Sequence, residues 1–192
     1  MIQYMLKIQG VSPILMNPAT DELLDALFGG AGARKAKATD RTMESVAKEK
    51  IIRDENGVIG IPIEYLFSCL VEAGRQIKID SKRAISTKDS TLLPSFLALE
   101  EMFLPFHDQD EPMIVDKRRG KLPKDGTAVC IVRPKFKRWS FDVIISVDEK
   151  KIAEDKVRTL FDTAGCSVGL GDFRPSCRGQ FGRFRVAEWE KM

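Results

Sequence analysis

A glycine-rich segment near the C-terminus has the residue types that suit phosphate binding. Residues 165–185 contain five of the 14 glycines of the chain, with four arginines interleaved. Glycine lets a main chain approach a ligand closely and present its N–H groups, and arginine makes bidentate contacts with phosphate oxygens. Gly169-Leu170-Gly171 follows an expected helix instead of opening one, so a dinucleotide-binding loop is disfavoured. The pattern predicts a phosphate-binding loop, and the alternative is a tight return to a last strand.

Positive charge is concentrated between residues 113 and 140. This stretch has nine basic and two acidic side chains, whereas the whole chain has a net charge of only +3. Phosphate backbones attract such patches through counterion release. Phe136 and Trp139 lie among these charges and could stack on bases. The alternative is that Trp139 is buried, because it lies on the same side of the expected strand as Phe141. The candidate binding residues here are Lys117, Arg118, Arg119, Lys121, Lys135, Lys137 and Arg138.

A second basic cluster follows the glycines at positions 29–32. Its members are Arg34, Lys35, Lys37 and Arg41, and the surrounding composition is rich in Ala, Lys and Thr. We expect residues 33–50 to form a mobile basic loop that also contacts nucleic acid.

No pattern of catalytic or metal-binding residues is legible. The single histidine, His107, has no serine or cysteine at a spacing that indicates a nucleophile and its base. Asp108, Asp110 and Glu111 follow no known ligand pattern. We therefore expect no catalytic residue, no metal and no cofactor. The four cysteines share no close spacing and are expected to be reduced core thiols: Cys69, Cys130, Cys166 and Cys177.

Hydrophobic periodicity places these features on a small set of elements. Residues 3–8 alternate as a half-buried strand does, and a short helix is expected over residues 20–28. Apolar residues recur at helical spacing from Pro62, expected at the first helical position, to Gly74. Residues 78–126 hold no clean long element.

The C-terminal half repeats this strand and helix pattern. Residues 128–133 and 139–147 are expected to form a β-hairpin around a turn at 134–138. A second helix, capped by Asp148, would bury Ile152, Val157, Leu160, Phe161 and Ala164. The last strand is expected at 183–189.

The resulting order is strand, helix, strand, strand, helix, strand. This order predicts a single α+β domain over residues 1–192 with a ferredoxin-like (split βαβ) fold, in which two helices cover one face of an antiparallel sheet. The core would comprise about 3–9, 62–77 and 127–189, with basic insertions at about 17–58 and 78–126. The open face of the sheet is one place where such a module can bind a partner.

Composition excludes several classes of protein. The 43% of hydrophobic residues permits a buried core, so a disordered chain is not expected. No stretch approaches the roughly 18 apolar residues of a membrane span, and the first residues lack the order of a signal peptide. We expect a cytoplasmic protein of a bacterium or a phage-infected cell, with no membrane partner.

The glycine-rich loop and the strand order together resemble a known superfamily. The loop ends Gly179-Gln180-Phe181-Gly182-Arg183-Phe184, just before the last strand. This arrangement is similar to the RAMP superfamily of CRISPR RNA-binding proteins, in particular the backbone subunits that polymerise along guide RNA. The stretch from Arg133-Pro134 to Arg183-Phe184 also resembles a family of small, uncharacterised phage and prophage proteins.

The resemblance to RAMP proteins implies a function in antiviral defence and assigns roles to loop residues. Arg174, Arg178 and Arg183 would hold the backbone of single-stranded RNA, with Gly179, Phe181 and Gly182 in the same motif. His107 does not align with the catalytic histidine of RAMP endonucleases, so RNA cleavage is not expected.

The sequence therefore predicts a non-enzymatic protein that binds single-stranded nucleic acid, with RNA favoured, through its phosphates and with little base preference. It would act as a homo-oligomer or as a subunit of a ribonucleoprotein complex. The alternatives are a phage single-stranded DNA-binding or annealing protein and a phage assembly protein. A RAMP-type endoribonuclease that uses His107 is an outside possibility.

Overall fold

Alternating apolar residues build a four-stranded antiparallel sheet. The computed structural model describes residues 1–19, 24, 25, 28, 41–121 and 126–192. The sheet order is β4-β8-β1-β9, formed by Leu97–Leu99, Ser140–Val147, Ile2–Gly10 and Phe184–Lys191. Leu6 pairs with Val143 and Tyr4 with Ile145, and all four side chains are buried. The alternation predicted for residues 3–8 and 139–147 is confirmed, because each segment buries its apolar parity. The last strand, predicted at 183–189, is β9.

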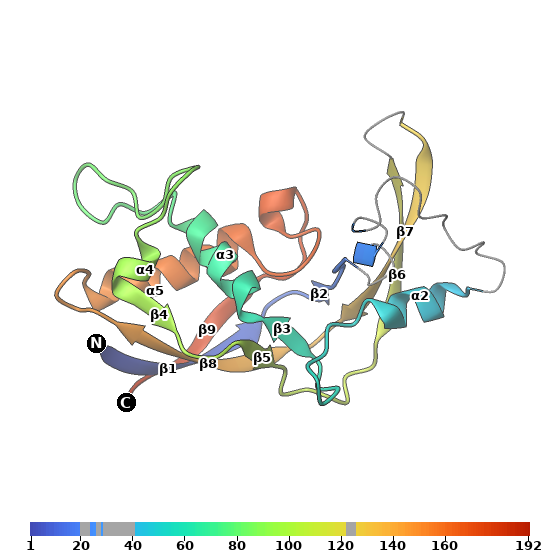
Figure 1. Ribbon diagram of the computed structural model, residues 1–192, viewed down its shortest axis with the longest axis horizontal. Helices are drawn as coiled ribbons and strands as arrows, with labels where there is room; N and C mark the ends of the chain where they lie inside the picture. The colour runs from blue at the N-terminus through green and yellow to red at the C-terminus, as the bar shows by residue number, and fades with distance from the viewer. Residues whose placement is uncertain (20–23, 26–27, 29–40, 122–125) are drawn as a thin grey trace.

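Two helices cover one face of this sheet (Figure 1). They are α3 (Ile63–Ala73) and α5 (Glu154–Thr163), and α5 continues into the π-helix η1 (Ala164–Val168). The predicted stripe of Val157, Leu160 and Phe161 is fully buried. Pro62 is the N-cap of α3 and not its first residue. The second helix begins later than predicted, because the backbone N–H groups of Lys151 and Ile152 donate to Asp148 O and close a separate turn, leaving Ala153 as the N-cap of α5.

The strand order is that of a split βαβ sheet. Counted along the chain, β1, β4, β8 and β9 are the first to fourth strands, α3 connects the first two and α5 the last two. All neighbours are antiparallel. The architecture is thus α+β and compatible with a ferredoxin-like or RAMP-like fold.

The predicted hairpin of residues 128–147 is wrong. β7 (Ala128–Phe136) pairs with β6 (Ile114–Lys121) and with β2 (Ile14–Leu15) in a separate three-stranded sheet, whereas β8 pairs with β1 and β4. Trp139 explains the separation. Its ring is buried next to Phe106 and Phe141, and its Nε1 donates to Ser12 O at 2.8 Å, so Trp139 anchors the start of β8 in the core, while Lys137 and Arg138 before it are exposed.

The regions expected to be irregular contain regular elements. The second sheet strand is β4, inside the predicted insertion, and β3 (Gly60–Pro62) pairs with β5 (Phe103–Pro105). Part of the expected basic loop is a helix, α2 (Met43–Glu49), because the Thr42 hydroxyl accepts from Ser45 N and Glu44 pairs with Lys48. Two further short helices are α4 (Leu93–Phe96) and η2 (Pro175–Cys177).

Several sequence predictions lie outside the described residues. These are Arg34, Lys35 and Lys37, and most of the short helix expected over residues 20–28. Within the described ranges, no helix is long and apolar enough to cross a membrane.

Candidate nucleic-acid interface

The glycine-rich loop between η1 and β9 folds back on itself. Leu170 N donates to Gly182 O at 2.9 Å, and Gly182 N donates to Pro13 O at 2.8 Å. Gly169, Gly171 and Gly182 have φ values of 77°, 74° and 69°, a region that favours glycine. The loop is therefore held in one conformation by its own backbone and by the segment that leads into β2.

Gly179 and Gly182 are needed for this close approach. A Cβ atom at Gly182 would overlap the carbonyl oxygen of Leu170, and one at Gly179 would overlap that of Phe173. Both glycines are buried. Their packing partners are thus atoms of the loop itself, and a contact with nucleic acid remains a prediction for them.

Two contacts join the loop to the β6–β7 hairpin. Arg133 Nε of β7 lies 2.6 Å from Asp172 Oδ2, and the Arg133 side chain is only 9% exposed. The Arg118 guanidinium of β6 lies 5.1 Å from the ring centroid of Phe173 and 4.8 Å from that of Phe181. The loop therefore packs against one face of the hairpin, although about 40 residues separate them in the chain.

The basic run at 117–121 lies in a strand, so the prediction of a loop is wrong. Side chains alternate along β6, and Arg118 shares its face with Asp116, to which it donates hydrogen bonds of 2.9 and 3.2 Å. Lys117, Arg119 and Lys121 are on the opposite face and are exposed. Arg118 is itself 40% exposed, but Asp116 and the loop rings hold its guanidinium group, whereas Lys117, Arg119 and Lys121 form an exposed row on the other face.

The three loop arginines have different surroundings. Arg174 donates from Nη1 to Gly171 O at 3.1 Å and is partly exposed. Arg178 is exposed, with a left-handed φ of 63°. Arg183 donates from Nε to Cys166 O at 3.2 Å, at the end of η1. Arg178 is therefore the exposed arginine of the three, whereas Arg174 and Arg183 are partly exposed and hydrogen-bonded within the protein.

The other predicted cations are scattered. Arg41 forms an ion pair with Glu49, and Arg138 forms one with the buried carboxylate of Glu111. Lys135 is half-buried in the centre of the β2-β7-β6 sheet, and Lys137 is exposed beyond the end of β7. Phe136 and Trp139 are each 2% exposed, so the predicted stacking of bases on them is wrong.

The open face of the four-stranded sheet is acidic. The register places Asp142, Glu188 and Glu190 on this face, and Glu100 accepts there from the Ser146 hydroxyl. The same face also carries Lys7, which pairs with Glu188 at 3.1 Å, and Arg185, which donates to Gln9. A phosphate backbone would be repelled by this face, so binding is expected at the hairpin and the loop.

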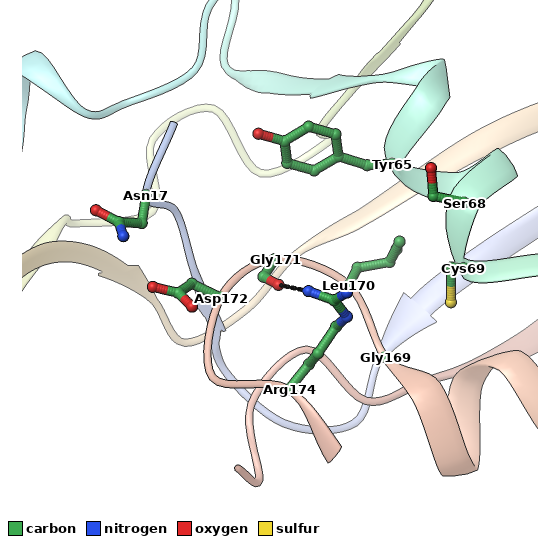
Figure 2. Close-up of a pocket in the computed structure, with 9 residues that line it drawn as sticks. All are labelled: Asn17, Tyr65, Ser68, Cys69, Gly169, Leu170, Gly171, Asp172 and Arg174. Atoms are coloured by element: carbon green, nitrogen blue, oxygen red, sulfur yellow. Dashed lines mark hydrogen bonds between the residues drawn. The ribbon is translucent and has the colours of Figure 1, made fainter. Parts of the chain in front are cut away.

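A cavity of about 300 Å3 lies where the loop meets α3 and the segment after β2. Figure 2 shows Tyr65 on one side and Gly171, Asp172 and Arg174 on the other, with Asn17 at one end and Cys69 at the opposite end. Burial raises the pKa of the Tyr65 phenol, and it raises the pKa of the Cys69 thiol to about 12, so both groups are protonated at neutral pH. Ser68, Gly169 and Leu170 complete the lining.

The sequence analysis missed this cavity and one side-chain contact. Asn17, Tyr65 and Ser68 come from segments with no shared motif, so no sequence signal could have brought them together. His107 lies 3.3 Å from the Ser140 hydroxyl through Nδ1 and 3.2 Å from Asp142 through Nε2. Among the described residues, the His, Cys, Asp and Glu side chains form no cluster suited to a metal ion.

Comparison with known proteins supports the fold. The sequence matches no protein-family model and no curated protein. The structure is similar to a chain of a solved complex described as "Cryo-EM structure of the Type III-B Cmr-beta bound to cognate target RNA", with a TM-score of 0.54 and 12% sequence identity. The match covers the whole of this protein and 60% of that chain. The likeness is therefore one of fold alone.

Proposed function

We propose that the protein binds single-stranded RNA through phosphate contacts along the glycine-rich loop and the β6–β7 hairpin. The observation that carries this proposal is the charge separation. The open sheet face is acidic, while Lys117, Arg119 and Lys121 form an exposed row on the β6–β7 hairpin, on the face opposite the one that Arg118 and Arg133 join to the loop. A polyanion is attracted to the second surface and repelled by the first.

The structural neighbour supports RNA as the polymer. Its description names a complex bound to target RNA, and the likeness extends over the full length of this protein. By this proposal the protein is a non-enzymatic, RAMP-like subunit of a ribonucleoprotein complex, repeated along the strand. Phosphate contacts carry no sequence information, so base identity has little effect on affinity.

A salt titration of binding tests the proposal. Affinities are measured for single-stranded RNA and DNA of one sequence. The proteins are the parent, the double variant Arg119→Gln/Lys121→Gln, and the control Lys88→Gln, which changes an exposed lysine outside this surface. The double variant should weaken binding and reduce the log K against log salt slope by about 0.7 per lost phosphate contact, whereas Lys88→Gln should match the parent. A parent that binds neither polymer at low salt refutes the proposal. Tighter binding of DNA than of RNA would favour a single-stranded DNA-binding protein instead.

A further inference from the structure

The cavity beside the loop has more hydrogen-bond donors than free acceptors. Asn17 Oδ1 accepts from Lys50 Nζ at 2.9 Å, which leaves the amide NH2 group as a donor. The Tyr65 and Ser68 hydroxyls can donate, and Arg174 Nη2 is only weakly paired, 3.8 Å from Glu72 Oε2. Three chain segments thus contribute donors to one space.

Among the described residues that line the cavity, the one carboxylate already has partners. Asp172 Oδ2 faces Arg133 Nε at 2.6 Å, and Asp172 Oδ1 accepts from Phe173 N at 2.7 Å. The Cys69 thiol is neutral and donates to Ala164 O. Including Lys50, Arg133 and Arg174 as cations, and Asp172 and Glu72 as anions, the surroundings of the cavity carry one net positive charge. An anion that enters it meets donors and little repulsion.

We infer that this cavity binds a phosphomonoester, either the terminal phosphate of a nucleic-acid strand or the phosphate of a free mononucleotide. A phosphomonoester carries a charge of about −1.5 to −2 at neutral pH and three acceptor oxygens. It matches a site with four donor side chains better than an internal phosphodiester, which has a single charge and two free oxygens. Arg174 would make the charged contact, and Tyr65, Ser68 and Asn17 would donate to the remaining oxygens.

If the ligand is the end of a nucleic-acid strand, the inference rests on the proposed function. The experiment distinguishes a failure of the inference from a failure of the proposed function. Binding of one RNA sequence is measured with a 5′-phosphate, a 3′-phosphate or hydroxyl ends only, beside adenosine 5′-monophosphate and inorganic phosphate as small probes. The proteins are the parent, Arg174→Gln, Tyr65→Phe and the matched control Arg178→Gln, which changes an exposed arginine of the same loop. Melting temperatures show whether each variant is folded.

RNA with a phosphate at one of its ends should bind about tenfold more tightly than the hydroxyl-ended RNA. A tenfold change in affinity is about the low end of what a hydrogen bond to a charged group contributes. Arg174→Gln should remove this preference, Tyr65→Phe should reduce it, and Arg178→Gln should keep it. Mononucleotide binding that Arg174→Gln abolishes, without any end preference in RNA, would assign the cavity to a free nucleotide.

Two results would overturn the inference. One is the absence of both end preference and mononucleotide binding, and the other is a preference that persists in folded Arg174→Gln and Tyr65→Phe. The hydroxyl-ended RNA reports separately on the proposed function, because it has no terminal phosphate. If it binds while neither an end preference nor mononucleotide binding is found, the proposed function stays intact and the inference alone is rejected.

Discussion

The guanidinium group of Arg118 lies 4.8 Å from the ring centroid of Phe181. This contact joins a strand of the three-stranded sheet to the loop that precedes the last strand of the four-stranded sheet. Arg118 also bonds to Asp116, whose side chain is only 8% exposed. Its position is therefore set by protein groups, whereas Lys117 and Arg119 on either side of it in the sequence face solvent.

Arg118 should accordingly differ from its neighbours when replaced by alanine. Arg118→Ala removes the contacts with two aromatic rings and leaves the buried Asp116 carboxylate without its partner, so it should lower the free energy of unfolding by about 1–3 kcal/mol. Lys117→Ala and Arg119→Ala should change stability by less than about 0.5 kcal/mol and weaken RNA binding. Urea denaturation and RNA titration of the three variants test this, and equal stability of all three would contradict it.

Phe141 should be among the most sensitive positions of the core. It is fully buried on β8, next to Trp139 and Phe106. Phe141→Ala removes a large side chain from a packed region and should cost about 3–5 kcal/mol of unfolding free energy. Asp142→Ala, at the next position on the exposed face, is the control, and a comparable loss there would mean that the face assignment is incorrect.

Gly182 should not tolerate a side chain. A substitution at Gly57 measures only the free-energy cost of a left-handed backbone conformation. Both have positive φ values, but a Cβ at Gly57 would have no neighbour within 4 Å, whereas one at Gly182 would overlap Leu170 O. Gly57→Ala should therefore destabilise by about 1–2 kcal/mol, the cost of a left-handed conformation, and Gly182→Ala by clearly more. Melting curves of the two variants decide the point. Similar values would show that the loop can move to accept a methyl group.

The four cysteines should divide into one unreactive and three reactive thiols. Cys130, Cys166 and Cys177 are exposed, contrary to the expectation of core thiols, and only Cys69 is buried. A maleimide reagent at pH 7.5 should modify three thiols of the native protein and the fourth only after unfolding. Rapid modification of all four in the native state would be inconsistent with this burial.

Cys69 should also make stability fall at alkaline pH. Burial raises its pKa to about 12, above the value near 8.5 expected in the unfolded chain. Between these values the native state keeps a proton that the unfolded state loses, so the free energy of unfolding decreases as pH rises. Urea denaturation between pH 8 and 10 should give a steeper decrease for the parent than for Cys69→Ala. Parallel curves would show that Cys69 does not contribute.

His107 should be dispensable for RNA binding, and the parent should not cut RNA. Its contacts with Ser140 and Asp142 bring together a hydroxyl, an imidazole and a carboxylate, but the His107 and Asp142 side chains are 41% and 50% exposed. His107→Ala should bind RNA like the parent. Cleavage at defined positions by the parent, lost in His107→Ala, would instead establish an endoribonuclease.

The sequence by itself determined the elements whose pattern is local. Alternation in residues 3–8 and 139–147, and helical spacing in 63–73 and 157–164, reflect burial of one face of each element, so their core residues could be identified without a structure. A phosphate-binding role for the glycine-rich loop could be proposed from composition, and it stays a prediction.

Only the tertiary structure decided which strands pair and which cations remain free. β7 could not be assigned to β6 from its own residues, because an apolar run fits any neighbouring strand and the burial of Trp139 depends on distant partners such as Ser12 and Phe106. The same holds for Arg118 and Arg133, which have the same charge as Arg119 but are held by Phe181 and Asp172 of the loop. Long-range packing, which a local pattern does not encode, separates the structural arginines from those available to a ligand.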